Sequence, residues 1–206
     1  MAPPAIAIIG AGPCGLTLAR LLERKGVTDY AVYERDWSAT EAAGSAAHHQ
    51  GGSLDLHVPT GQRALREAGL FDRFRAHARW DDGVMAFCDR TGDRVVDDLG
   101  QERDLPEIDR ADLRSILLDA VPAEKIRWGH ALKRAALGAD GAPVLEFGNG
   151  QTLSGFRLVV GTDGAWSKVR SLVWIAFEPP LPPLSLSLFG WVIAKLLIDF
   201  ASFVHR

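Results

Sequence analysis

The sequence predicts an α/β fold with a central parallel sheet, and three observations lead to that prediction. Residues 5–9 form a short continuous apolar run with β-branched side chains, which is typical of a strand buried on both faces. Leucine and alanine residues then recur at helical spacing between Pro13 and Gly26. Residues 30–33 (YAVY) form a second apolar run that ends at Glu34. Strand, helix and strand in this order predict a βαβ unit with parallel strands.

The rest of the first 170 residues has clear local signals. Three segments have the apolar spacing of helices: residues 60–68, 71–78 and 109–120. Asp109 stands where it can cap the last of these helices. Two runs flank a polar turn and predict a small hairpin: residues 84–88 and 94–97. Four runs separated by Gly-rich turns predict a β-meander: residues 126–128, 134–137, 144–147 and 152–153. Residues 157–161 predict another buried strand.

Composition limits the classes of protein that the chain can belong to. It has 206 residues, 47% of them apolar and 24% charged, as in an ordinary globular protein with one domain or one domain and part of a second. The net charge of -3 gives no electrostatic reason to expect nucleic acid as a partner. Cys14 and Cys88 are the only cysteines, so we expect no structural disulfide and a cytoplasmic location.

The sequence changes character near residue 170. Residues 171–206 contain four charged residues, whereas the first 170 contain 45, and prolines crowd into residues 179–183. Residues 184–204 are almost all apolar and long enough to span a bilayer, although Lys195 and Asp199 interrupt them. We therefore expect a domain over residues 1–170 and an atypical apolar tail over 171–206. The tail is interpreted first as a non-native ending, and alternatively as a membrane anchor or as a helix that packs over the domain.

A glycine turn at residues 10–15 (GAGPCG) connects the first predicted strand to the first helix. Gly10 allows the tight turn, Gly12 leaves room for phosphates, and Gly15 lets the helix approach the strand. With Pro13 in the first helical turn, the helix N-terminus offers N–H donors and a positive dipole to a pyrophosphate. Glu34 at the end of the second strand can accept hydrogen bonds from ribose hydroxyls. The pattern indicates a dinucleotide site, but the spacing leaves NAD and FAD both open.

Five segments together resemble flavin-dependent aromatic hydroxylases of the para-hydroxybenzoate hydroxylase class, and especially the tetracycline-inactivating monooxygenase branch. These segments are residues 5–15, 32–35, 51–57, 106–114 and 159–170. The resemblance covers about residues 5–170, which corresponds to the N-terminal part of such an enzyme. It implies a Rossmann-like FAD-binding fold that is C-terminally truncated, because the class continues into a substrate-covering sheet and a second flavin motif.

The resemblance also implies roles for individual residues. Arg35 is expected beside Glu34 near the adenine and ribose, and Asp55 near the flavin ring. Arg110 is expected at the pyrophosphate and ribityl chain, where an arginine fork suits phosphate oxygens. Asp163 and Gly164 correspond to the Asp-Gly motif that helps to hold FAD and the nicotinamide donor. For Asp55, a carboxylate that caps a turn remains an alternative.

One segment departs from the tetracycline-inactivating branch. That branch has an arginine before the Gly-Gly pair that contacts the nicotinamide donor, whereas this chain has Ala47, His48, His49 and Gln50 there. Neutral histidines are poor replacements for a phosphate-binding arginine. His48 and His49 are weak evidence for a metal, because no carboxylate or cysteine lies beside them in the sequence.

The class uses NADPH to reduce FAD and then transfers one oxygen atom from O2 to an electron-rich substrate, with the flavin carrying the difficult chemistry. We therefore expect no catalytic dyad in this chain. We expect FAD as cofactor, NADPH as the donor of the full-length family, and a small aromatic or polyketide-like substrate. Because the second flavin motif and substrate sheet are missing, we expect weak or no activity from the chain alone. A non-catalytic dinucleotide-binding or membrane-tethered protein is the alternative.

Overall fold

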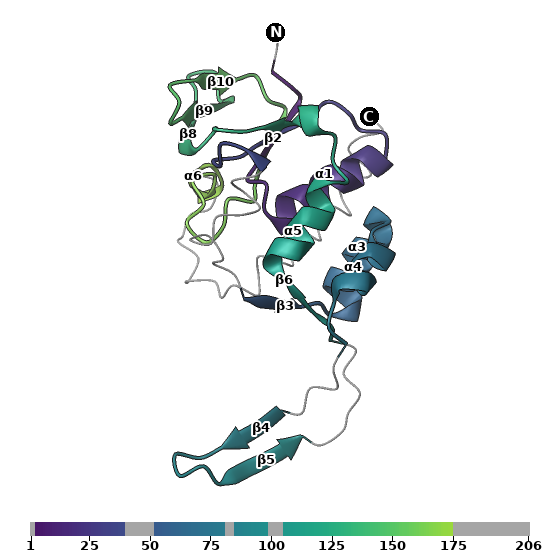
Figure 1. Cartoon of the computed structure of the whole chain (residues 1–206). Helices are drawn as coiled ribbons and strands as arrows, with labels where there is room; N and C mark the ends of the chain where they lie inside the picture. Colours follow the sequence, from purple (N-terminus) through teal and green to yellow (C-terminus); the bar gives the residue numbers. More distant parts are fainter. Residues whose placement is uncertain (1–2, 40–51, 81–84, 99–104, 175–206) are drawn as a thin grey trace. The chain divides into compact units, whose positions relative to one another are not determined.

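The structure is a computed structural model of the chain, and it describes residues 3–39, 52–80, 85–98 and 105–174 (Figure 1). The chain divides into two compact units, Met1–Val169 and Arg170–Arg206. Of the second unit, the structure describes helix α6 (Arg170–Trp174). The apolar segment 184–204 lies outside the described residues. Within the described ranges, no helix combines the length and apolarity required to cross a membrane.

A four-stranded parallel sheet forms the centre of the first unit. Its strand order is β11 (Leu158–Gly161), β1 (Ile6–Ile9), β2 (Tyr30–Tyr33) and β7 (Ile126–Arg127). Every residue of β1 and β2 is buried, as their continuous apolar sequences predict. All three pairings are parallel, so the carboxyl ends of the strands share one edge. This confirms the predicted α/β fold with a central parallel sheet.

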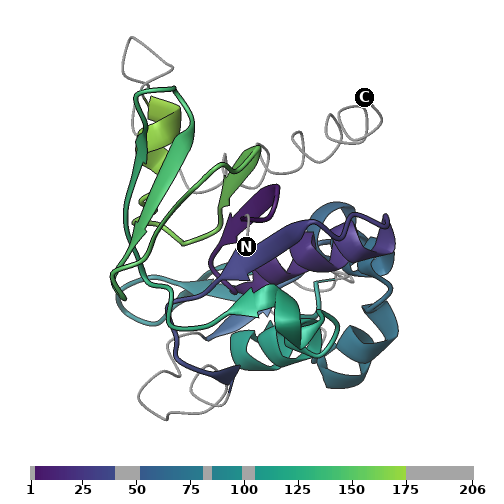
Figure 2. The same cartoon turned by 90° about the horizontal axis from the view of Figure 1, so that it is seen from above.

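Helix α1 (Pro13–Arg24) connects β1 to β2 and buries its apolar face against them. The helix begins at a proline, which needs no hydrogen-bond partner there, and the chain leaves it at Gly26, whose φ is +74°. Helix α5 (Arg110–Leu118) packs beside α1, and both views show the two helices next to each other (Figures 1 and 2). The most deeply buried side chains of this layer and the sheet include Ile8, Leu16, Val32 and Leu117.

The predicted helix over residues 60–68 begins with a π-helical segment, η2 (Val58–Gln62), and continues as α3 (Arg63–Ala68). It ends at Gly69, which has a left-handed φ of +69°. Helix α4 (Phe71–His77) follows at once, as predicted. The predicted hairpin consists of β4 (Met85–Cys88) and β5 (Arg94–Asp98), which pair in antiparallel fashion.

A short antiparallel ladder joins β3 (Ser53–Asp55) to β6 (Glu107–Asp109), and β6 leads directly into α5. Asp109 occupies the N-cap position of α5, but its side chain makes no capping hydrogen bond. The prediction that Asp109 caps this helix is therefore wrong. Its Oδ1 instead accepts a hydrogen bond from Arg79 at 3.1 Å, and Glu107 pairs with the same guanidinium at 3.3 Å. An ion pair with Arg79, which follows helix α4, has replaced the local cap.

The predicted β-meander is present as three antiparallel strands: β8 (Leu132–Leu137), β9 (Pro143–Phe147) and β10 (Thr152–Ser154). The ring of Phe147 on β9 stacks on Tyr33 of β2, with 5.2 Å between ring centroids. The meander therefore contacts the sheet through aromatic side chains. Because side chains alternate along a strand, Tyr30 lies on the opposite face from Tyr33. Burial is the main cause that raises the pKa of the Tyr30 hydroxyl, and the Glu23 carboxylate of α1 raises it further.

The first of the four runs that predicted the meander, residues 126–128, contributes to the central sheet. Residues 126–127 form β7, which follows the short 3-10 helix η3 (Ala123–Lys125) and pairs with β2 in the central sheet. The assignment to the meander was therefore wrong. Helix α5 returns the chain to the start of the sheet, so that the next strand runs parallel to β2 and meets the free edge of that strand.

Two leucines of the meander allow a matched test of its core. Leu145 is fully buried on β9, whereas Leu137 on β8 is 46% exposed. Leu145→Ala should lower the free energy of unfolding by about 2–5 kcal/mol, because it removes buried apolar volume and leaves a cavity. Leu137→Ala should change it by only about 0.5 kcal/mol. Urea unfolding followed by circular dichroism measures both, and equal losses would contradict the described packing.

Candidate functional site

The glycine turn between β1 and α1 is closely packed at both ends and open in the middle. Gly10 has a φ of +105°, and a Cβ at this position would lie 2.7 Å from the Thr162 carbonyl oxygen. A Cβ on Gly15 would lie 2.0 Å from the carbonyl oxygen of Gly10. At Gly12, in contrast, a Cβ would meet no atom within 4 Å. The turn thus presents bare backbone to its surroundings at Gly12.

The open position lies at the N-terminus of α1. Gly12 is the N-cap residue, Pro13 is the first helical residue, and the first turn contains no acidic side chain. The N–H groups of a first helical turn lack partners within the helix, and the helix dipole places positive charge there. The backbone around Gly12 therefore has the chemistry of an anion site.

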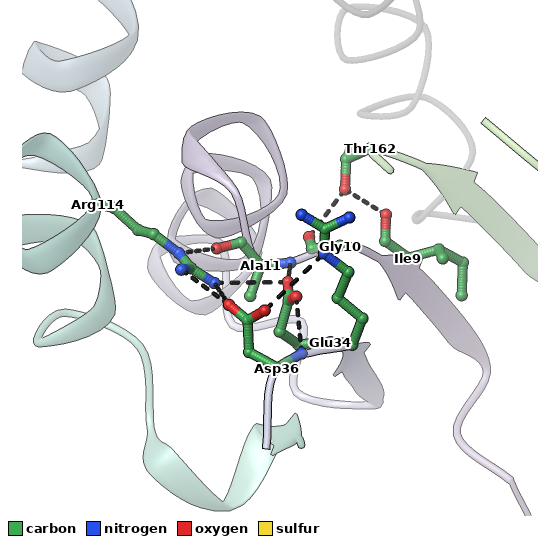
Figure 3. A network of polar contacts seen from close by, with 8 residues as sticks. Ile9, Gly10, Ala11, Glu34, Asp36, Arg114 and Thr162 are labelled. Carbon is green, nitrogen blue, oxygen red and sulfur yellow. Dashed lines mark hydrogen bonds and ion pairs between the residues drawn. The ribbon is translucent and has the colours of Figure 1, made fainter. Parts of the chain in front are cut away.

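Glu34 is buried at the end of β2, with 5% of its surface exposed. Its Oε2 accepts a hydrogen bond from the Ala11 N–H, so the carboxylate contacts the glycine turn directly (Figure 3). Its Oε1 accepts a hydrogen bond from the Asp36 N–H at 3.2 Å. The structure therefore brings the acidic residue that the sequence singled out against the turn.

Arg114 joins this cluster, although the sequence did not single it out. Its Nε donates to the Ala11 carbonyl oxygen at 2.8 Å, and its two terminal nitrogens both lie 3.1 Å from Asp36 Oδ2 (Figure 3). One of these nitrogens also lies 3.6 Å from Glu34 Oε2. The sequence signal was present in α5, because Arg114 stands beside buried Leu113 and one helical turn after Arg110.

Arg35 and Arg110 belong to different elements, since Arg35 follows β2 and Arg110 begins α5. The Arg35 side chain is 81% exposed, and its Nε lies 3.8 Å from Asp36 Oδ1. Arg110 is the first residue of α5, and its charge acts on the first turn of α1. Desolvation by the surrounding protein raises the pKa of the Cys14 thiol, and the positive charge of Arg110 acts in the opposite direction. Arg110 thus adds positive charge near the start of α1.

Thr162 holds the glycine turn from the side of β11. Its Oγ1 lies 2.7 Å from the Ile9 carbonyl oxygen and 2.9 Å from that of Gly10, so its hydroxyl can donate to either of them (Figure 3). The backbone N–H of Thr162 also donates to the Ile9 carbonyl oxygen, at 2.9 Å. The segment that contains the predicted Asp-Gly pair is therefore attached to the turn.

Asp163 has one satisfied and one unsatisfied carboxylate oxygen. Oδ2 accepts a hydrogen bond from the Lys168 N–H at 2.8 Å. Oδ1 is buried and has no hydrogen-bond partner among the described residues. Gly164 follows with a φ of +86°, and a Cβ there would meet no atom within 4 Å. An unpaired buried carboxylate oxygen is costly, so this oxygen is suited to accept a hydrogen bond from a ligand.

Asp55 is not part of the cluster around Ala11. It is exposed on β3, opposite Glu107 of β6. His48 and His49 lie outside the described residues. In the part of the chain that the structure describes, no group of three or more His, Cys, Asp or Glu side chains could hold a metal ion.

The site as described fits a dinucleotide. Bare backbone at Gly12, the N-terminus of α1 and the charge of Arg110 suit a pyrophosphate. The carboxylate of Glu34 at the end of β2 suits hydroxyl groups.

The different surroundings of Gly12 and Gly15 lead to a stability prediction. Gly15→Ala should lower the free energy of unfolding by about 1–3 kcal/mol or more, since the new Cβ overlaps backbone that cannot move aside. Gly12→Ala should change it by less than about 1 kcal/mol, because its φ of -81° suits alanine and the space is open. Thermal and urea unfolding distinguish the two variants; a larger loss for Gly12→Ala would contradict the described packing.

Comparison with known proteins agrees with this geometry. The FAD binding domain family matches residues 4–196, a range that runs past the change of character near residue 170. The chain is 32% identical over 185 residues to the monooxygenase asqM of Emericella nidulans. It is 37% identical over 168 residues to 3-amino-4-hydroxybenzoate 2-monooxygenase of Streptomyces cremeus. These matches cover 84% and 82% of the chain, and 41% of each relative.

A solved structure shows the same fold. The tetracycline destructase Tet(51) matches with a TM-score of 0.57 and 24% identity, over 82% of this chain and 41% of that one. The chain thus spans about 41% of the length of these relatives. The family match covers most of the chain, and both curated relatives exceed 30% identity. The resemblance found in the sequence is confirmed: the chain belongs to the FAD-binding domain family of flavin-dependent monooxygenases.

Proposed function

We propose that the chain binds the ADP half of FAD across the glycine turn. The pyrophosphate lies in front of Gly12 and the ribose hydroxyls meet Glu34. The observation that carries this proposal is the open backbone at Gly12, which lies at the N-terminus of α1 next to a buried carboxylate. Arg110 supports it, since its charge reaches the same helix start. These features provide donors for phosphate and acceptors for hydroxyl groups.

The remaining predicted contacts extend the proposal along the cofactor. Arg35 is exposed at the end of β2 and available to the adenine and ribose end. Asp163 Oδ1, buried and without a partner among the described residues, accepts a hydrogen bond from the cofactor beyond the pyrophosphate, with Gly164 beside it. Asp55 is proposed to lie near the flavin ring. Its exposed position at the end of β3 leaves it available to a ligand.

The whole protein is proposed to be a monooxygenase that uses NADPH as electron donor. FAD, when bound, supplies hydride acceptance and oxygen activation, while the residues described here bind and orient it. The substrate is proposed to be a small aromatic or polyketide-like molecule, and the name of the Streptomyces cremeus relative supports the aromatic alternative. The segment that matches the donor-contacting arginine of the tetracycline-inactivating branch, residues 47–50, lies outside the described residues.

The role of Gly12 can be tested without disturbing the fold. Gly12→Ala should weaken FAD binding by about tenfold or more, because a side chain blocks the approach of phosphate to backbone N–H groups. Quenching of flavin fluorescence on titration with protein measures the dissociation constant. Arg134→Gln is the matched control, since it removes an exposed ion pair with Glu146 in the meander. Unchanged FAD affinity in Gly12→Ala would refute this location for the pyrophosphate.

The choice of FAD over NAD is tested by thermal unfolding of the unmodified chain. FAD at a hundred times its dissociation constant should stabilise the folded state by about 2.7 kcal/mol and raise the unfolding temperature by several degrees. NAD at the same concentration should produce a much smaller shift. A shift with NAD and none with FAD would show that the assignment to FAD is wrong.

A further inference from the structure

Arg114 contacts both the glycine turn and the acidic residues that follow it at the end of β2. Its guanidinium uses three different nitrogens: Nε on the Ala11 carbonyl oxygen at 2.8 Å, and both terminal nitrogens on Asp36 Oδ2 at 3.1 Å. The side chain is only 17% exposed. A fixed planar fork of donors is required for such a set of contacts, and lysine, with one donating atom, cannot reproduce it.

Glu34 and Arg114 together fix the peptide groups on both sides of Ala11. The N–H of Ala11 donates to Glu34 Oε2, and the carbonyl oxygen of the same residue accepts from Arg114 Nε. Arg114 also provides a countercharge to the Glu34 carboxylate, at 3.6 Å from Oε2. A buried carboxylate needs such compensation, and its orientation is set by the groups that provide it.

The carboxylate of Glu34 retains capacity for a ligand. A carboxylate has about four acceptor positions. In this structure Oε2 meets the Ala11 N–H and Arg114, and Oε1 meets the Asp36 N–H. Acceptor positions therefore remain for a hydroxyl group, and the direction in which they point depends on the partners already in place.

We propose that Arg114 is a positioning residue that holds the Glu34 carboxylate in the orientation required to accept a hydrogen bond from the 2′-hydroxyl of the adenosine ribose. This inference rests on the proposed binding of FAD. Arg110 and Arg114, one helical turn apart on α5, then have different roles. Arg110 acts at the start of α1, where the phosphates bind, and Arg114 acts on the ribose through Glu34 and Asp36.

The test compares two ligands that differ only in that hydroxyl, ADP and 2′-deoxy-ADP, by titration calorimetry with the whole chain. The unmodified chain should bind ADP about tenfold more tightly, which corresponds to one hydrogen bond to a charged acceptor. In Arg114→Gln and Arg114→Lys the preference should fall to about twofold or less. If Arg114 served folding alone, its replacement would weaken the binding of both ligands equally and leave the ratio of their affinities unchanged.

Arg73→Gln is the matched control. Arg73 also donates to one carboxylate, Asp119 at 2.7 Å, and to one backbone carbonyl, that of Ile116 at 3.4 Å, but it does so at the other end of α5. This variant should keep the full preference for ADP. Asp36→Asn provides a second variant at a site that is one-quarter exposed, and it should reduce the preference by removing the main anchor of Arg114.

The outcomes separate this inference from the proposed function. Loss of the preference in the Arg114 variants, or in Asp36→Asn if the former do not fold, supports the positioning role. If the unmodified chain binds FAD and prefers ADP to 2′-deoxy-ADP, but the preference is the same in every variant, the inference is wrong and the proposed function stands. If the ratio of the two affinities is near one throughout, the inference is wrong and the proposed contact of Glu34 with the 2′-hydroxyl fails with it, while the binding of FAD at the glycine turn stands. If the unmodified chain binds neither FAD nor ADP, both fail.

Discussion

The buried carboxylate of Glu34 is the constraint on which the site depends. A buried charge must be hydrogen-bonded and compensated, or the fold loses several kcal/mol. The partners here come from three places: the glycine turn after β1, the segment after β2, and helix α5. The backbone of Glu34 is fixed as well, through hydrogen bonds with Arg127 and His130 at 2.9 and 2.7 Å. Satisfying one charge therefore joins the sheet, the turn and the helix into one rigid arrangement.

The glycine turn is held from two sides and left open between them. Thr162 contacts the carbonyl oxygens of Ile9 and Gly10 from the β11 side, while Arg114 holds Ala11 from the α5 side. Gly12, the next residue, faces open space. A turn fixed in this way loses little conformational entropy when a ligand binds, which favours affinity without additional contacts. The local geometry is therefore preorganised before any ligand arrives.

The sequence predicted the features that depend on near neighbours. Apolar runs, helical spacing and glycine positions identified β1, α1, β2 and the turn, because each is determined by a few consecutive residues. Prediction from the sequence failed where a residue pairs with a partner that is distant in the sequence. The two residues of β7 pair with the free edge of β2, and the side chain of Asp109 at the N-cap pairs with Arg79 and does not cap α5. Arg114 escaped notice because its partner Ala11 lies 103 positions away, and no local pattern distinguishes it from a surface arginine.

The pairing of β1 with β11 has a consequence for biosynthesis. Ile9 lies opposite Gly161, so the central strand cannot complete its ladder until about 150 further residues have left the ribosome. At typical translation rates this takes on the order of ten seconds, during which an apolar strand edge is exposed. Such non-local pairing slows folding and prolongs the interval in which chains can aggregate. Thr162 comes directly after β11, so the glycine turn gains its hydrogen bonds with Thr162 only at the end of that interval.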